Sequence, residues 1–192
     1  SSYRPLEPLT VPIDPTATIH PTAIIEPGVL IGKDVKIGAY SYIQGHCYIG
    51  NYTSIGEHVV IQAGTMIGTD AFYFKERDTG FEKWSSAGEV VIEDHVFIGA
   101  ACTINKGVSG ATIIGRGSKL DSQVHIGHGV VLGPNCLLAG QVGVGGKTVI
   151  GEGVKIYGHA GIANNLQIGD RAVILAKTGV LKDLEGHKSY FG

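Results

Sequence analysis

Aliphatic residues recur at every sixth position along most of the chain. From Ile13 to Ile67 each sixth residue is isoleucine, ten in succession. The spacing resumes from Ile92 to Ile104, and again from Ile114 to Val180, with Ile, Leu or Val at every step. An amphipathic α-helix would need a period of about 3.6 residues. These 25 six-residue units therefore predict an all-β fold built by repetition of one short strand.

A second inward position recurs two residues before each of these aliphatic residues, where the side chain is usually small or β-branched. Residues two apart on a strand share a face, so each unit contributes one large and one small inward side chain. Three units, 18 residues, would close a triangular coil, and we predict a parallel β-helix of about eight stacked coils. The small inward positions include the three cysteines, which we expect to be core residues: Cys47, Cys102 and Cys136.

Glycine follows the aliphatic residue in twelve units. We expect these glycines to permit the unusual backbone angles and the close approaches that sharp corners require.

The interruptions of the repeat define the expected organisation. We expect residues 1–12 to form an N-terminal cap, residues 13–180 the β-helix domain, and residues 181–192 a short C-terminal arm over the last coil. Residues 73–91 break the repeat and are predicted to form an extruded loop, and residues 106–113 a smaller bulge. Five of the fourteen aromatic residues lie within 72–84. A long loop on a regular scaffold is often functional, although its aromatic residues could equally pack on one another.

Composition narrows the function classes only moderately. A hydrophobic content of 43% and a charged content of 17% exclude a disordered chain. The absence of a CxxC pair argues against a zinc ribbon, and the odd cysteine count without a signal peptide indicates a cytoplasmic protein. No apolar run reaches transmembrane length, which leaves contact with a membrane surface possible.

The two halves of the chain differ in charge. Residues 1–100 hold 6 Lys and Arg against 12 Asp and Glu, while residues 101–192 hold 9 against 5. The basic second half suits an anionic ligand or an acidic partner protein, although scattered solvated charge explains it equally well. Nothing in the pattern indicates nucleic-acid binding.

Two histidines stand three residues apart in an otherwise plain repeat. The strand phase points His125 outward and places His128 on the following corner. One coil later, 18 residues on, the column of His128 holds Gly146, and one coil further it holds Asn164. A neutral imidazole can accept a proton and an uncovered glycine N–H can donate to an oxyanion, which together make a minimal acyl-transfer site. A convex corner alone cannot exclude water, so we expect a second subunit to pack there, as in a trimer of prisms.

Three segments strengthen this interpretation: GTDAF at 68–72, TINKG at 103–107 and HIGH at 125–128. With the hexads, they resemble the hexapeptide acyltransferases of lipid A biosynthesis, and most closely the UDP-3-O-acylglucosamine N-acyltransferase family, over roughly residues 13–190. The resemblance implies a left-handed β-helix and a homotrimer with sites between subunits. It also implies transfer of a 3-hydroxyacyl chain from acyl carrier protein to the amine of a nucleotide-linked glucosamine. The family's N-terminal nucleotide-binding domain has no counterpart in these 192 residues.

The resemblance also implies roles for individual residues. His128 matches the catalytic base and Gly146 the oxyanion donor. Asn165 stands where the family has a second histidine, and it can hydrogen-bond without carrying a proton. The residues assigned to substrate binding are His125, Asp70, Phe72, Asn164 and Asn165.

The basic second half suggests how the donor is held. We assign Lys147 and Lys177 to the phosphates of the co-substrate, which is either the phosphopantetheine thioester of acyl carrier protein or an acyl-CoA. No tightly bound cofactor and no metal is expected.

Three alternatives remain at this point. An acetyl-CoA-dependent amino-sugar N-acetyltransferase would use the same residues, whereas a long apolar groove would favour a fatty acyl chain. A γ-class carbonic anhydrase-like enzyme could use His125, His128 and His159 as zinc ligands, although that family spaces two of its histidines five apart and here they are three apart. A catalytically silent scaffold would need neither His128 nor Gly146.

Overall fold

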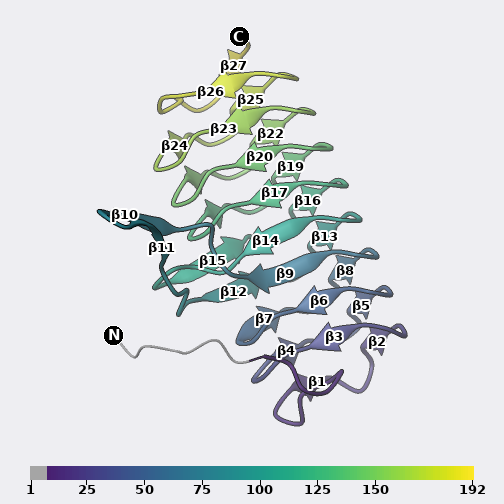
Figure 1. Cartoon of the computed structure of the whole chain (residues 1–192). Helices are drawn as coiled ribbons and strands as arrows, with labels where there is room; N and C mark the ends of the chain where they lie inside the picture. Colours follow the sequence, from purple (N-terminus) through teal and green to yellow (C-terminus); the bar gives the residue numbers. More distant parts are fainter. Residues whose placement is uncertain (1–7) are drawn as a thin grey trace.

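Each six-residue unit forms a short strand that ends at its aliphatic residue. In β3 (Leu30–Ile31) and β4 (Lys36–Ile37), the first residue is exposed and the isoleucine is buried. The next two or three residues turn a corner, and the following unit begins another strand. In the computed structural model, which describes residues 8–192, these strands stack into one column of coils with β1 (Thr18–Ile19) near one end and β27 (Ser189–Tyr190) at the other (Figure 1).

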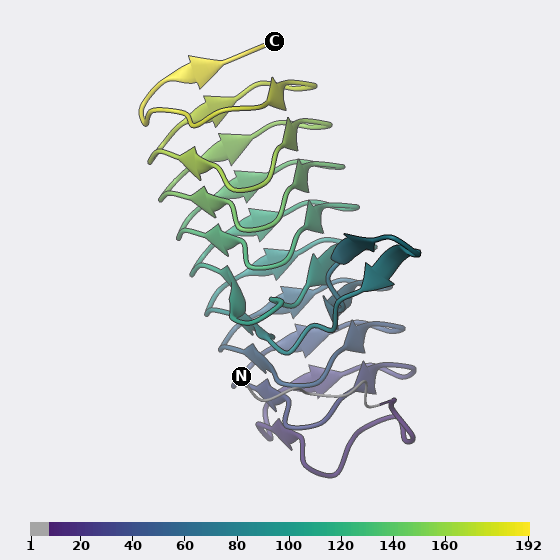
Figure 2. The same ribbon diagram turned by 60° about the vertical axis from the view of Figure 1, so that its left-hand side comes forward.

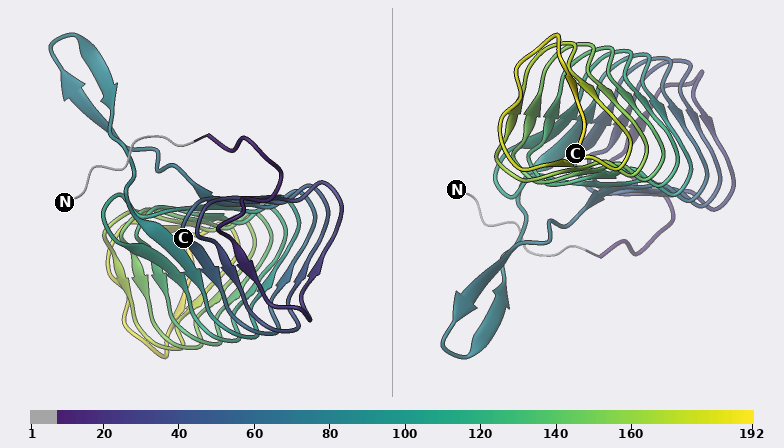
Figure 3. Two further views of the ribbon diagram at one scale, coloured as in Figure 1. Left: turned by 90° about the horizontal axis from the view of Figure 1, so that it is seen from below. Right: turned by 90° about the horizontal axis from the view of Figure 1, so that it is seen from above.

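The coils build three parallel sheets, which form the sides of a prism (Figure 3). The first sheet holds β1 (Thr18–Ile19), β4, β7 (Thr53–Ile55), β12 (Glu89–Ile92), β15 (Ala111–Ile114), β18 (Val131–Leu132), β21 (Val149–Ile150) and β24 (Gln167–Ile168). The second holds β2 (Ile24–Ile25), β5 (Tyr42–Ile43), β8 (Val60–Ile61), β13 (Phe97–Ile98), β16 (Lys119–Leu120), β19 (Leu137–Leu138), β22 (Lys155–Ile156), β25 (Val173–Ile174) and β27 (Ser189–Tyr190). The third holds β3, β6 (Tyr48–Ile49), β9 (Met66–Thr69), β14 (Thr103–Asn105), β17 (His125–Ile126), β20 (Gly143–Val144), β23 (Gly161–Ile162) and β26 (Gly179–Val180).

The strand register repeats the sequence period. Ile19 pairs with Ile37 and Ile25 with Ile43, both 18 residues apart. The all-β parallel β-helix predicted from the hexads is therefore confirmed, and so is the left hand that the resemblance implies. None of the described residues forms a helix long and apolar enough to cross a membrane.

The interior is a stack of the aliphatic residues with small partners between them. The free thiols of Cys47, Cys102 and Cys136 are buried in this stack, and burial raises the pKa of each, that of Cys136 to about 11. A thiol with a raised pKa is a poor nucleophile. The prediction that the cysteines serve as small core residues is confirmed.

The corners correct one expectation about glycine. The left-handed backbone angle falls three residues after the aliphatic residue. Sixteen non-glycine residues have positive φ values at this position, among them Lys147 (62°) and Asn165 (60°), so glycine is not required there. Among the twelve glycines directly after the aliphatic residue, only Gly68 has a positive φ (79°), and the others permit close approach between coils. A Cβ on Gly38 would lie 2.5 Å from the carbonyl oxygen of Gly56 in the next coil, a distance that no side chain tolerates.

The largest interruption is a two-stranded antiparallel hairpin, β10 (Phe74–Arg77) and β11 (Gly80–Lys83), which projects away from the coils (Figure 2). The hairpin is inserted between β9 and β12. Because of this insertion, Ile55 pairs with Ile92, which is 37 residues later instead of 18. The loop range predicted as 73–91 is too long, because β12 begins at Glu89 and pairs there with β15. The carbonyls of Gly107 and Val108 in the second interruption accept hydrogen bonds from Gly88 and Ala87 at the base of the hairpin.

The two ends also differ from the expectation. Residues 181–192 do not form a separate arm, because they pair with the coil before them. Leu184 forms a β-bridge with Ile168, and β27 pairs with β25. The paired residues are 16 apart instead of 18, so the chain ends in a shortened coil that extends two of the sheets. Residues 1–7 of the predicted N-terminal cap lie outside the described residues. The carbonyl of Pro12 accepts a hydrogen bond from Ile31, so the stacking already begins there.

One edge of the prism collects the irregular features. The chain passes there from the third sheet to the first, and we call it the insertion edge, made by residues 68–88, 105–110, 127–130, 145–148 and 163–166. Both interruptions and the corner that bears His128 lie on it. The edge is therefore where the scaffold departs from pure repetition.

The stacked core predicts which isoleucines carry stability. Replacing the fully buried Ile98 by Ala should lower the free energy of unfolding by about 2–5 kcal/mol, since it removes apolar burial and leaves a cavity. The matched change Ile24→Ala, at a side chain 60% exposed, should cost under about 0.5 kcal/mol. Urea unfolding followed by far-UV circular dichroism at one protein concentration measures both. Equal losses for the two variants would contradict the assignment of the interior.

Candidate active site

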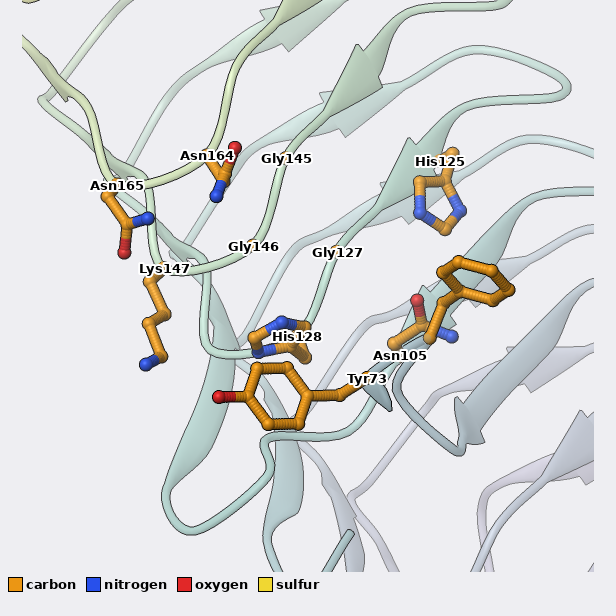
Figure 4. A pocket seen from close by; sticks show the side chains of 11 residues that line it. Tyr73, Asn105, His125, Gly127, His128, Gly145, Gly146, Lys147, Asn164 and Asn165 are labelled. Carbon is orange, nitrogen blue, oxygen red and sulfur yellow. The ribbon is translucent and has the colours of Figure 1, made fainter. Parts of the chain in front are cut away.

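A pocket of about 440 Å³ lies on the insertion edge where three consecutive coils meet the base of the hairpin (Figure 4). It is lined by both histidines of the 125–128 segment and by residues from the corners of the next two coils. The full set is Phe72, Tyr73, Asn105, His125, Gly127, His128, Gly145, Gly146, Lys147, Asn164 and Asn165. This volume is within the usual range for a small-molecule site.

His128 packs directly on Gly146 of the next coil. A Cβ added to Gly146 would lie 2.6 Å from Nε2 and 2.8 Å from Cδ2 of the imidazole, so only glycine fits beside this ring. The contact is fixed by the backbone, because Ile126 pairs with Val144 and Lys147 N–H donates to the His128 carbonyl at 2.8 Å. The column of His128 over Gly146 expected from the 18-residue spacing is present in the structure.

The N–H of Gly146 donates no hydrogen bond to any of residues 8–192. At the same position of some other corners, a side chain from the next coil accepts this bond: Glu57 N–H donates to Asp94 Oδ1 at 2.9 Å and Glu152 N–H to Asp170 Oδ1 at 2.8 Å. Asn164 occupies the corresponding position above Gly146 but makes no such bond. The Gly146 N–H is thus an available donor beside His128.

The ring of Tyr73 covers the imidazole of His128 on the side of the hairpin. Its ring meets that of His128 edge to face, with centroids 5.6 Å apart and planes at 77°. Figure 4 shows Tyr73 on one side of the imidazole and Gly146 on the other. The Tyr73 carbonyl accepts a hydrogen bond from the Trp84 N–H at 2.9 Å, which ties this residue to the return strand of the hairpin. The orientation of His128 is set by packing contacts with both elements.

The electrostatics favour a neutral imidazole at position 128. Burial lowers the pKa of His128 below its ordinary value of 6.5, and the nearby Lys147 ammonium lowers this pKa further. Its Nδ1 is buried and has no hydrogen-bond partner among residues 8–192. Partial desolvation also lowers the pKa of His125. Near pH 7 His128 is therefore able to accept a proton.

The hairpin base is held by a polar cluster next to the pocket. The carboxylate of Asp70 lies 3.2 Å from Lys106 Nζ and 3.8 Å from Lys83 Nζ. The amide of Asn105 donates to Thr69 Oγ1 at 2.8 Å and to the Asp70 carbonyl at 3.2 Å. Asp70, assigned to sugar binding from the sequence, is thus placed beside the pocket lining and in ion pairs that fix the start of the hairpin.

The structure brings together most of the residues assigned from the sequence. His128, Gly146, His125, Phe72, Lys147, Asn164 and Asn165 line one pocket. Lys177 does not join them, because it lies on the edge between the second and third sheets, where its N–H donates to Gly158. His159, nominated as a zinc ligand, lies on that same edge. No group of three or more His, Cys, Asp or Glu within the described part of the chain is placed to hold a metal ion.

Four pocket residues were not assigned from the sequence: two glycines, Gly127 and Gly145, and two residues with larger side chains, Tyr73 and Asn105. Tyr73 stands between two phenylalanines in the aromatic loop, and Asn105 belongs to the TINKG segment, so both lay within recognised motifs. What was missing was the fold of the hairpin, which decides which of its side chains turns toward His128.

Comparison with known proteins relates the chain to bacterial transferases with the same repeat. The profile of the bacterial transferase hexapeptide family (six repeats) matches residues 28–63 and 111–146. UDP-3-O-acylglucosamine N-acyltransferases are similar over short regions: that of Agrobacterium fabrum is 43% identical over 79 residues, and that of Methylobacterium nodulans 46% over 79 residues. These regions are 41% of this chain and 22% of each relative, so the match spans under a quarter of the curated relatives' length.

Solved structures extend the likeness to nearly the whole chain. A UDP-N-acetylglucosamine acyltransferase of Francisella novicida superposes with a TM-score of 0.82 at 29% identity, over 89% of this chain and 61% of that one. The UDP-N-acetylglucosamine O-acyltransferase of Moraxella catarrhalis superposes with a TM-score of 0.72 at 34% identity, over 90% of this chain and 68% of that one. The chain belongs to the bacterial hexapeptide-repeat transferase family.

Proposed function

We propose that this protein is an acyltransferase that moves a 3-hydroxyacyl chain from a thioester donor to the amine of a nucleotide-linked glucosamine. The observation that carries the proposal is the pairing of a neutral, partly buried His128 with a Gly146 whose N–H is free. In this assignment His128 is the general base and the Gly146 N–H is the oxyanion donor. The names of the relatives, all acyltransferases acting on UDP-glucosamine derivatives, support the substrate class.

The reaction uses each group once. The amine nitrogen attacks the thioester carbonyl carbon and forms the new C–N bond, while the carbonyl electrons move to the oxygen beside the Gly146 N–H. His128 takes the proton that the nitrogen loses. The tetrahedral intermediate then collapses, the C–S bond breaks, and the departing sulfur takes the proton from His128. The products are an amide and a free thiol, and the imidazole is neutral again.

The remaining pocket residues suit the two substrates. His125, Asn164 and Asn165 provide polar groups for the acceptor, and Lys147 provides a cation for a phosphate. We assign acyl carrier protein as the donor, with acyl-CoA as the alternative carrier of the same phosphopantetheine thioester. Lys177 lies on a different edge of the prism, so it could reach this pocket only from a second subunit, as in a homotrimer in which each site lies between neighbours.

Transfer itself is tested by incubating the protein with acyl carrier protein and CoA thioesters and several amino-sugar nucleotides, with products followed by mass. We expect a product that carries the acyl group and resists mild alkali, because an amide survives conditions that hydrolyse an ester. The variant His128→Asn should be at least about 100-fold slower, since the general base is lost. Alkali-labile product would indicate a hydroxyl acceptor, as the solved O-acyltransferase suggests. An active His128→Asn variant would rule out the mechanism.

Tyr73 should set the pH dependence of the reaction. Protonated His128 cannot act as a base, so kcat/KM should rise with pH through a pKa below 6.5 and level off near neutrality. Tyr73→Ala admits water to the ring, which should raise this pKa toward 6.5 and move the acidic limb to higher pH, while Tyr73→Phe should keep the wild-type limb. NMR titration of His128 measures the same pKa without catalysis. A limb that stays in place in Tyr73→Ala would show that the ring contact does not govern the base.

Gly146→Ala should disable the site without unfolding the coil. The new Cβ would meet His128 Nε2 at 2.6 Å, so the ring must move, and misplacement of a catalytic group by about 1 Å costs roughly 100-fold in rate. Gly161→Ala is the matched control, because a Cβ there meets no atom within 4 Å. Initial rates and thermal unfolding of both variants make the comparison. Similar rates for the two would exclude Gly146 from the reaction.

A further inference from the structure

Asn164 stands at a corner position where another asparagine on the same edge of the prism forms a hydrogen bond. Asn51, two residues after the aliphatic residue of its coil, accepts the Lys33 N–H of the coil before it at 2.9 Å through Oδ1. Asn164 has the same place in its own coil, and the N–H one coil before it belongs to Gly146. Although the residue type is the same, Asn164 makes no such bond, and its side chain lines the pocket instead.

The backbone stacks in the same way at both corners. A Cβ added to Gly32 would lie 2.7 Å from the backbone nitrogen of Asn51. One added to Gly145 would lie 2.6 Å from the backbone nitrogen of Asn164. Only the side chains differ, because Oδ1 of Asn51 is the atom nearest to the first point, whereas backbone atoms are nearest to the second. The amide of Asn164 has therefore turned away from an N–H that it could accept.

The turned amide faces the space beside the free N–H of Gly146. Figure 4 shows Asn164 above Gly146, with its side-chain nitrogen turned toward the corner of Gly146 and its oxygen turned away. A backbone N–H and an amide NH₂ cannot bond to each other, because both are donors, but they can share one acceptor. Since His128 packs on Gly146 from the preceding coil, an acceptor held by both donors would lie close to the base.

We propose that Asn164 is a second oxyanion donor, so that its Nδ2–H and the Gly146 N–H both bond the thioester carbonyl oxygen as negative charge develops on it. The inference rests on the proposed acyl transfer at His128, and it narrows the role of Asn164 from the acceptor to the donor carbonyl. Asparagine suits this role because it has donor hydrogens, whereas the carboxylates at other corners only accept. Two donors fixed in advance stabilise the developing charge more than one.

Steady-state kinetics separate this role from acceptor binding. In Asn164→Ala, kcat should fall by roughly 100-fold with little change in either KM, because a bond made only in the transition state is lost. In Asn164→Asp, the carboxylate should accept the Gly146 N–H, as Asp170 accepts that of Glu152, so both donors are lost and kcat should fall at least as far. A raised KM for the acceptor with an unchanged kcat would overturn the inference.

Asn51→Ala is the matched control, at the same corner position but outside the pocket. It removes an existing hydrogen bond of the fold, so the midpoint of thermal unfolding should drop by about 2–4 °C while kcat stays at the wild-type value. Asn164→Ala should show the reverse, a wild-type midpoint and a low kcat, because its side chain makes no bond to the corner. Equal losses of kcat in the two variants would contradict the inference.

Infrared difference spectroscopy tests the two donors without an acceptor substrate. The probe is 3-hydroxydecanoyl-CoA with an isotope-labelled carbonyl, whose stretching frequency falls when the carbonyl oxygen accepts hydrogen bonds. We expect a fall on binding to the wild type, a smaller one in Asn164→Ala and none in Asn164→Asp.

The spectroscopic outcomes separate this inference from the proposed function. A fall that depends on Asn164, without transfer to any acceptor, would retain the two donors and reject the proposed reaction. Equal falls in the wild type and Asn164→Ala, or none in the wild type, would overturn the inference, and the reaction would stand if the wild type transfers the acyl group.

Discussion

The in-register stacking of 18-residue coils is the constraint on which the whole structure depends. Each backbone group of a strand pairs with the coils on either side, so every residue has a fixed neighbour one period earlier and one period later. Stacking forces each corner to lie over the next, and it is this overlap that excludes a Cβ from the glycines after the aliphatic residues. A site built on such a scaffold inherits its precision from the backbone. The contact between His128 and Gly146 is a case of this, since it needs no hydrogen bond between side chains.

The insertion edge shows how a repetitive scaffold acquires chemistry. At some corners a carboxylate or amide of one coil accepts an N–H of the coil before it, as Asn51, Asp94 and Asp170 do. On the insertion edge this capping fails at Gly146, and one donor stays available. The same edge accepts the hairpin, because the second interruption provides carbonyls at Gly107 and Val108 to bond its base. The unbonded N–H of Gly146 and the hairpin whose base covers His128 therefore lie on the same edge.

Most of the architecture and part of the site follow from the period alone. The six-residue spacing identifies the buried aliphatic residues, and a spacing of 18 puts Gly146 beside His128. The shortened last coil was also within reach, since Leu184 and Tyr190 are six apart and follow Val180 with a shift of four. The position of Tyr73 was not, because no period relates residue 73 to residue 128. That contact depends on how a non-repetitive hairpin folds back, and the base of this hairpin is held by long-range contacts such as those of Asp70 with Lys83 and Lys106.

The pKa of a catalytic histidine depends on whether packing or a carboxylate holds its ring in place. A carboxylate partner on Nδ1 would raise the pKa of an imidazole, whereas burial and a neighbouring ammonium lower it, as they do for His128. Tyr73 contributes to this burial through its ring contact with His128, and it also lines a neighbouring hollow with Phe72, Phe74 and Phe81. A molecule in that hollow would contact the same side chain that packs on the imidazole. Displacement of Tyr73 would let water reach the imidazole and raise its pKa, so the position of this one side chain affects the proton affinity of the base.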